Sequence, residues 1–201
     1  MNDPNIVWHE RLVSKQERNR LNKHRSGIVW FTGLPASGKS TLAHHLEKEL
    51  FNRSIRAYVF DGDNVRHGLC SNLGFSREDR RENLRRIAEM CKLFIDAGIV
   101  VLTAFVSPYR EDREYVRNLI GNDGFFEVYI KCSVDICEKR DPKGHYRKAK
   151  EGIIKNFTGV SDPYEEPENP DLVIDTEKMD VESSVQNVLE LLGKKGFILL
   201  I

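Results

Sequence analysis

Short runs of β-branched and aromatic residues alternate with longer stretches of helical periodicity along most of this 201-residue chain. The clearest helical stretch is residues 77–97, where Leu84, Ile87 and Cys91 recur near the 3.6-residue period before Gly98. Alternating strand and helix patterns are typical of a parallel sheet joined by crossover helices. The expected strands are residues 28–32, 56–60, 99–105, 125–131 and 171–174. The expected helices are residues 14–24, 39–51, 77–97, 110–120, 133–140 and 181–194.

The chain length fits a single domain. With 40% hydrophobic and 31% charged residues, the composition is typical of a soluble globular protein. We therefore predict one α/β domain over residues 1–201, in which the polar residues 1–26 form an N-terminal arm.

One segment, about residues 141–170, interrupts the alternation. It contains four prolines and three glycines and has no sustained apolar period. We expect a long loop without regular structure, and loops of that length in compact domains usually have a function, most often as a lid over a bound ligand.

The distribution of charged residues argues against nucleic acid and membranes as partners. Lys and Arg number 31, equal to Asp and Glu, so a general basic surface for nucleic acid is not expected. The uncharged stretch 97–109 is shorter than a membrane span, and the charged residues 1–26 do not fit a signal peptide. We therefore expect a cytoplasmic protein that binds neither nucleic acid nor membrane.

The four cysteines do not fit a metal or redox motif. Cys70, Cys91, Cys132 and Cys137 lack CxxC spacing and a histidine at zinc-finger spacing. We expect them to act as small buried hydrophobic residues, and a reducing compartment argues against a disulfide.

A complete phosphate-binding loop, GxxxxGK[ST], follows the first expected strand and opens a helix. Backbone N–H groups of such a loop converge with a helix N-terminus on bound phosphates. Lys39 would contact the outer phosphates, and the Ser40 hydroxyl would ligate magnesium. The expected ATP-binding residues are Gly33, Leu34, Pro35, Ala36, Ser37, Gly38, Lys39, Ser40 and Thr41.

The loop alone does not define the reaction. A GTPase needs the motif NKxD, but the only Asn-Lys pair, Asn22-Lys23, precedes the loop. Two carboxylates, Asp61 and Asp63, instead follow the second expected strand, and parallel strands open onto one crevice at their carboxyl ends. These carboxylates can organise magnesium-bound water and accept a proton from an attacking hydroxyl, as a small-molecule kinase requires.

Basic side chains near these carboxylates suggest an anionic acceptor. Arg66 lies three residues past Asp63, and Arg80 lies with Asn83 at the start of a long helix, where acids are more usual. Taken alone, the two arginines are either surface charges or anion ligands, and Phe75 is either a core residue or a face on which a base stacks.

Further strings accompany these residues in a fixed order: Trp30-Phe31-Thr32-Gly33-Leu34, Asp61-Gly62-Asp63-Asn64-Val65-Arg66-His67-Gly68-Leu69, Leu73-Gly74-Phe75-Ser76, Asp79-Arg80, Asn83, Phe105-Val106-Ser107-Pro108-Tyr109-Arg110, Arg140-Asp141-Pro142-Lys143-Gly144, Phe157-Thr158-Gly159 and Pro163-Tyr164-Glu165. In this order and spacing, residues 6–193 resemble the adenylylsulfate kinases, which phosphorylate the 3′-hydroxyl of adenosine 5′-phosphosulfate with magnesium ATP. The chain length resembles the stand-alone form of that enzyme.

The resemblance implies a P-loop three-layer sandwich with a mainly parallel sheet, helices on both faces and a lid, and it implies a homodimer. It places Arg140 on the ATP side, Ser40 and Asp61 at Mg²⁺, and Phe75 and Phe157 around the adenine of the acceptor. The implied acceptor-binding residues are Asp63, Arg66, Phe75, Arg80, Asn83, Val106, Ser107, Lys143 and Phe157.

The implied catalytic residues are Lys39, Asp61, Asp63 and Ser107, and two questions about them stay open. Either carboxylate can be the base. Ser107 matches a serine that some descriptions of the family treat as a phosphorylated intermediate, but direct in-line transfer needs no covalent step and is our first hypothesis.

The chain departs from the family pattern at a few positions, and two rival functions remain. His145 stands where a leucine is more usual, and the apolar tail 197–201 can pack on the core or on a dimer partner. The nearest rival function is a P-loop kinase for another small metabolite or nucleoside. A rival of another class is a non-catalytic nucleotide-binding module.

Overall fold

The computed structural model describes residues 5–199 and contains a five-stranded sheet of order β2-β3-β1-β4-β5. All the neighbouring strands of this sheet pair in parallel, so the predicted parallel α/β architecture is confirmed. The strands are β1 (Ile28–Thr32), β2 (Ala57–Asp61), β3 (Val100–Ala104), β4 (Phe125–Lys131) and β5 (Leu172–Asp175).

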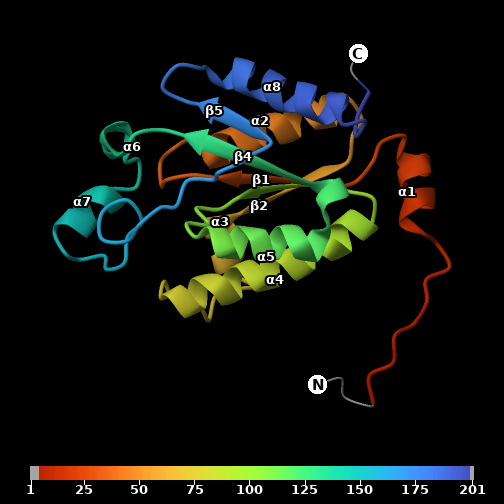
Figure 1. Ribbon diagram of the computed structural model, residues 1–201, viewed down its shortest axis with the longest axis horizontal. Coiled ribbons are helices and arrows are strands. Elements are labelled where there is room, and N and C mark those ends of the chain that lie inside the picture. Colours follow the sequence, from red (N-terminus) through yellow and green to blue (C-terminus); the bar gives the residue numbers. More distant parts are fainter. Residues whose placement is uncertain (1–4, 200–201) are drawn as a thin grey trace.

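Helices cover both faces of the sheet, which gives the predicted three-layer sandwich. Figure 1 shows α2 and α8 on one face and α4 and α5 on the other, with α1 near one end of the molecule and α6 and α7 near the opposite end. The helices are α1 (Lys15–Asn22), α2 (Lys39–Asn52), α3 (Gly62–Arg66), α4 (Arg77–Asp96), α5 (Arg110–Ile120), α6 (Val134–Arg140), α7 (His145–Lys150) and α8 (Val181–Lys194), with a 3-10 turn η1 (Asn122–Gly124).

The central strand β1 explains why the sheet needs helices on both sides. Its side chains alternate between the two faces, and all of its residues are buried. Val29 and Phe31 pack in the core cluster of α2 and α8, whereas Ile28 and Trp30 pack in the cluster of α4 and α5. Burying a large apolar side chain contributes roughly 1.5–3 kcal/mol, so β1 stabilises both halves of the core.

The register brings the carboxyl ends of β2, β3 and β1 to the same end of the sheet. Asp61 at the end of β2 pairs with Ala104 at the end of β3, and Phe31 near the end of β1 also pairs with Ala104. β1 lies between β3 and β4, so the chain leaves it at the point where the strand order reverses direction. In open α/β sheets this point forms the ligand crevice.

Two short helices were not predicted, and the expectation that residues 141–170 lack regular structure is wrong. Helix α3 is a single turn after β2, too short for an apolar period to reveal it. Helix α7 buries only Tyr146 and Ala149. Those two side chains join a third apolar cluster with Leu34 and Phe157, so tertiary contacts stabilise α7.

The C-terminal tail packs on the core within the chain, as far as the structure describes it. Phe197 and Ile198 are buried in the cluster of α2 and α8, and the Phe197 ring lies 4.7 Å from the Phe126 ring, edge to face. The part of the predicted tail at residues 200–201 lies outside the described residues.

The cysteine prediction is confirmed, because all four cysteines are free and buried. Within residues 5–199, no helix combines the length and the apolar character that crossing a bilayer requires.

Candidate active site

The phosphate-binding loop connects β1 to α2 in a conformation that its glycines and Lys39 define. A Cβ atom on Gly33 would lie 2.5 Å from the Ile130 carbonyl oxygen, so a larger residue would separate the loop from β4. Gly38, with φ of 105°, is the N-cap residue before α2. The Lys39 Nζ donates hydrogen bonds to the carbonyls of Gly33, at 2.9 Å, and Leu34, at 2.7 Å. The lysine therefore lies inside the loop, where a bound phosphate would meet it.

Burial changes the acidity of Lys39. Removal from water disfavours the charged ammonium and lowers the pKa of Lys39 to about 8, although the nearby Asp61 and Asp63 carboxylates oppose the shift. An anion that binds beside Lys39 would therefore stabilise the charged form of this lysine.

Ser40 and Asp61 meet at the start of the crevice. The Ser40 hydroxyl donates a 2.6 Å hydrogen bond to Asp61 Oδ2, while Asp61 Oδ1 accepts from the backbone N–H of Asp63 and caps α3. The structure therefore brings together the two residues predicted to hold magnesium. Within residues 5–199, no group of three or more His, Cys, Asp or Glu side chains could hold a metal by itself. A Mg²⁺ ion here would complete its oxygen ligands with phosphate oxygens and waters, as is usual for this ion.

Asp63 joins the β2 end of the crevice to the segment 141–170. Its exposed carboxylate forms an ion pair with the Lys143 ammonium, which is equally exposed. Two residues predicted to bind the acceptor, 80 positions apart in the chain, thus lie side by side.

Two arginines, Arg66 and Arg80, contact the exposed aromatic ring of Phe75. The Arg66 guanidinium lies 4.4 Å from the centre of the Phe75 ring and donates hydrogen bonds to the carbonyls of Leu73 and Gly74. The Arg80 guanidinium lies 5.7 Å from the same ring. Phe75 is 58% exposed, so it is not a core residue, and its ring contacts the two guanidinium groups.

Arg80 also reaches the segment 141–170. Its Nη2 donates a 2.6 Å hydrogen bond to the carbonyl of Asn156. The next residue, Phe157, is buried with its ring edge-on to Tyr146 at 5.0 Å. The start of α4 and the segment 141–170 therefore lie in contact with each other.

The turn after β3 carries Val106 and Ser107. Ser107 is only 3% exposed, and its hydroxyl accepts from Trp30 Nε1 at 3.1 Å and donates to Thr32 Oγ1 at 3.0 Å. The Thr32 hydroxyl in turn donates to the Val106 carbonyl. The Ser107 side chain thus points into the protein.

Asn83, which the sequence predicts to bind the acceptor, has a buried side-chain oxygen without a hydrogen-bond partner among the described residues. This oxygen is Oδ1, and the side chain is buried near the start of α4. A buried amide oxygen without a partner costs free energy, so a ligand donor at this position would be favourable.

Arg140 connects α6 to the phosphate-binding loop. It donates to both the Thr176 carbonyl, at 2.7 Å, and the Thr176 hydroxyl, at 3.0 Å. That hydroxyl donates to the carbonyl of Ser37 in the loop. Arg140 and Thr176, the residue after β5, therefore lie beside the phosphate-binding loop.

Comparisons with known proteins identify the family of this chain. The sequence model of the family described as adenylylsulphate kinase matches residues 25–175. The chain belongs to the adenylylsulphate kinase family. It is 58% identical over 187 residues to a probable adenylyl-sulfate kinase of Halalkalibacterium halodurans, covering 93% of each chain. It is 57% identical over 194 residues to the adenylyl-sulfate kinase of Oceanobacillus iheyensis, covering 96% of this chain and 98% of that one.

A solved structure of this family also superposes on the chain. The APS kinase of Mycobacterium tuberculosis, in complex with AMPPNP and APS, matches with a TM-score of 0.81 and 45% identity, over 84% of this chain and 98% of that one. The family resemblance and the α/β fold expected from the sequence are thereby confirmed.

The sequence prediction missed some residues that organise the site. Arg113, Thr32 and Tyr146 support the residues above through buried contacts, but none of them was singled out for a role. The signal for Arg113 was weak, because an arginine within an amphipathic helix usually lies on a solvated face.

Proposed function

We propose that this adenylylsulphate kinase family member transfers the γ-phosphoryl group of ATP to the 3′-hydroxyl of adenosine 5′-phosphosulfate. The observation that carries the proposal is the hydrogen bond of 2.6 Å between Ser40 and Asp61, which joins the phosphate-binding loop to the carboxylates after β2. Phosphoryl transfer needs donor and acceptor sites in one crevice, and this contact supports that arrangement.

On the donor side, the loop from Gly33 to Thr41 cradles the phosphates of ATP, with Arg140 beside it. When phosphate binds, the Lys39 ammonium exchanges its contacts with the loop carbonyls for phosphate oxygens. Ser40 and Asp61 would hold Mg²⁺, which neutralises charge on the transferring group. Their hydrogen bond fits this assignment, because both side chains present oxygens to one point.

On the acceptor side, two arginines, Arg66 and Arg80, and the ring of Phe75 form the proposed adenylylsulfate site, completed by Asn83, Val106, Ser107, Lys143 and Phe157. The guanidinium groups match an anionic ligand, and the exposed ring of Phe75 matches a nucleobase. The unpartnered Asn83 Oδ1 offers an acceptor for a ligand N–H or O–H group.

We propose direct in-line transfer. The 3′-hydroxyl gives its proton to the Asp61 or Asp63 carboxylate, its oxygen forms a bond to the γ-phosphorus, and the bond from that phosphorus to the bridging oxygen of ADP breaks. The Ser107 hydroxyl is buried and hydrogen-bonded to Trp30 and Thr32. These contacts support a structural role for Ser107 in the turn and argue against a role as a phosphate carrier.

The proposed activity is tested with the purified protein, ATP, Mg²⁺ and adenosine 5′-phosphosulfate. We expect stoichiometric ADP and a product phosphorylated at the 3′-oxygen, identified by mass spectrometry and ³¹P NMR. A panel with adenylate, gluconate and other small alcohols serves as the comparison. A higher kcat/KM for any of these than for adenylylsulfate would reject the proposed acceptor.

We further propose that residues 1–201 act as one cytoplasmic domain that forms a homodimer, with the segment 141–170 as a lid. The N-terminal arm supports the dimer, because Ile6, Trp8 and Leu12 are strongly exposed in the single chain. Sedimentation velocity tests the proposed homodimer. A mass of about two chains is expected, and a monomer at micromolar concentration would contradict the homodimer.

A further inference from the structure

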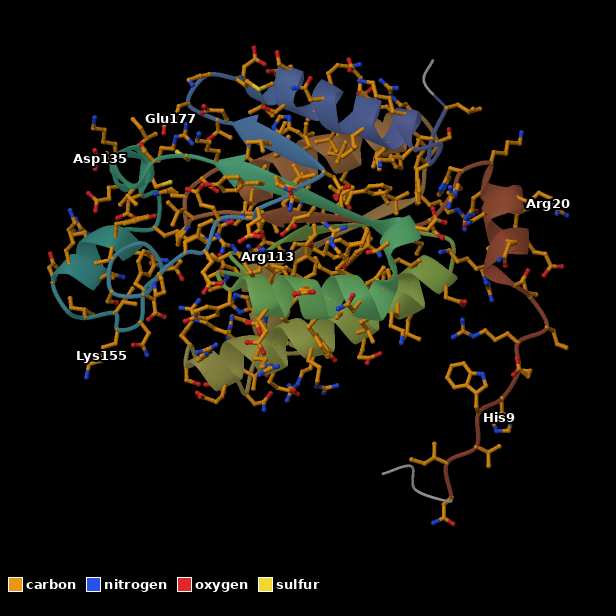
Figure 2. The ribbon with its side chains drawn as sticks, in the orientation of Figure 1. His9, Arg20, Arg113, Asp135, Lys155 and Glu177 are labelled. Carbon is orange, nitrogen blue, oxygen red and sulfur yellow. The ribbon has the colours of Figure 1, made fainter. Side chains whose placement is uncertain are left out.

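Arg113 is a buried arginine whose three nitrogen atoms face three different parts of the molecule. It lies on α5, and Figure 2 labels it in the interior of the molecule. Arg113 is 3% exposed. Its Nε donates to Glu127 Oε1 on β4 at 2.7 Å, its Nη1 to the Ser107 carbonyl at 2.6 Å, and its Nη2 to the Glu165 carbonyl at 2.7 Å. A guanidinium has donors in a fixed planar fork, so it can make these contacts together, which a lysine cannot.

One end of this fork holds a strained turn. Ser107 has φ of 40°, a left-handed conformation that is costly for a residue with a side chain. Such a conformation persists only where neighbouring contacts enforce it. Arg113 supplies one of these contacts at the Ser107 carbonyl, while Trp30 and Thr32 hold the hydroxyl.

The other end holds the point where the segment 141–170 rejoins the body of the protein. Besides the hydrogen bond from Arg113, the Glu165 backbone N–H donates to the Pro108 carbonyl at 2.8 Å. The ring of the preceding residue, Tyr164, lies 5.8 Å from the Arg113 guanidinium. Arg113 therefore joins the Ser107 turn to the base of this segment.

We propose that Arg113 is a positioning residue for the phosphoryl acceptor, which acts by fixing the Ser107 turn against the base of the segment 141–170. The proposal rests on the proposed function for the identity of the acceptor. Lys143 and Phe157, both on that segment, and Val106, on the turn, belong to the proposed acceptor site. Arg113 touches none of the reacting groups, so its effect passes through these two backbone segments.

The chain contains a matched control. Arg117 lies one helical turn further along α5, and its Nη2 contacts Glu127 and Asp171, at 3.5 and 3.2 Å. Arg117 thus shares the helix and the Glu127 partner of Arg113, while its contacts in the described structure lie away from the turn and from Glu165. Arg113 is more buried than Arg117, with 3% against 25% of the side chain exposed, so a purely structural role predicts a larger effect at Arg113. Such a role also predicts parallel changes in the constants for ATP and for adenylylsulfate.

The kinetic test compares Arg113→Lys with Arg117→Lys. Arg113→Lys is expected to lower kcat/KM for adenylylsulfate by about tenfold or more, since small misplacements of a reactant have effects of this size, and to leave the KM for ATP within about threefold. Arg117→Lys is expected to leave both constants within about threefold. Equal losses in the two variants, or a parallel loss for ATP and adenylylsulfate, would overturn the proposal.

Hydrogen–deuterium exchange gives a readout that does not depend on the activity. In Arg113→Lys, peptides covering residues 105–109 and 163–167 should exchange faster, while peptides in β5 and α8 keep their rates. Uniformly faster exchange would contradict a local role. If the wild-type protein does not phosphorylate adenylylsulfate, the proposed function fails, and the exchange data alone decide whether Arg113 fixes the two segments. If Arg113→Lys does not fold, the double variant Arg113→Gln/Glu127→Gln, which removes both buried charges, takes its place.

Discussion

Burial controls the acidity of Lys39, the lysine of the phosphate-binding loop. Its ammonium lies inside the phosphate-binding loop, and loss of hydration lowers its pKa from 10.5 to about 8. The free protein therefore holds this charge at a cost in stability, and a phosphate group that binds beside the lysine removes part of that cost.

This cost predicts a pH dependence of stability. Below pH 8 both the folded and unfolded states carry the charge, and the folded state carries the full penalty. Between pH 8 and 10.5 the folded state releases the proton first, so the unfolded state binds more protons and the free energy of unfolding rises with pH. Urea unfolding at pH 7.5 and 9.5, in the wild type and in Lys39→Met, should show a smaller rise in the variant. An equal rise in both proteins would contradict the assignment.

The two carboxylates after β2 should respond differently to removal of charge. Asp61→Asn keeps an oxygen that can cap α3, because asparagine is a good N-cap, but it loses the charge beside Ser40. We expect a rise of about tenfold in the Mg²⁺ concentration that gives half-maximal rate, with little change in thermal stability.

Asp63 is exposed and pairs with Lys143, whereas Asp61 is hydrogen-bonded to Ser40. Asp63→Asn should lower kcat by about 100-fold or more at saturating Mg²⁺ if Asp63 is the base. Near-normal kcat in this variant would assign proton transfer to Asp61. The two variants measured together, with rates recorded against Mg²⁺ concentration, therefore separate metal binding from proton transfer.

At the scale of elements, Arg80 joins the start of α4 to the proposed acceptor site. The side chain joins α4 to the segment 141–170 at the Asn156 carbonyl and borders the Phe75 ring. Arg80→Ala should raise the KM for adenylylsulfate by about tenfold and leave the KM for ATP unchanged, because a hydrogen bond from a charged group and a local anchor are lost.

Arg85 provides the control for this prediction. It lies on the same helix, is exposed, and pairs with Glu82. Arg85→Ala should leave both KM values unchanged, since exposed ion pairs contribute little. A rise in the KM for ATP in Arg80→Ala, or an equal effect in Arg85→Ala, would remove Arg80 from the acceptor site.

The elements also show where sequence patterns lose information. Helix α4 was predictable because six of its side chains are buried at regular spacing and Ser76 caps its start through the N–H of Asp79. Helix α7, with two buried residues, has too few turns for a period to be visible. Its position depends on Leu34, which is distant in sequence, and on Phe157, which lies in the irregular stretch after the helix. No local pattern could have revealed those contacts.

At the scale of the whole molecule, the C-terminal tail closes the core of α2 and α8. The Phe197 ring packs on Phe126 and also lies beneath the Arg25 guanidinium, which is 4.3 Å from the ring centre. Phe197→Ala should lower the free energy of unfolding by about 3–5 kcal/mol, the usual cost of deleting a buried phenylalanine. Urea denaturation measures this change.

Leu199, two residues further on, is 76% exposed and is the matched control. Leu199→Ala should change stability by less than about 0.5 kcal/mol. Both variants should keep the wild-type kcat and KM at low temperature, because the tail packs on the face of the sheet that carries α2 and α8. A similar loss of stability in the two variants would mean that the tail contributes through contacts other than the Phe197 ring.

The sequence by itself determined the parallel α/β fold, the phosphate-binding loop and the family, because each depends on a local pattern. Alternating periods specify strands and helices, and a loop of fixed spacing has one backbone geometry. Only the tertiary structure decided which side chains meet, such as Lys143 with Asp63 and Arg113 with Ser107 and Glu165. These partners are far apart in the chain or on different elements. Their contacts depend on strand register and burial, which no short stretch of sequence encodes.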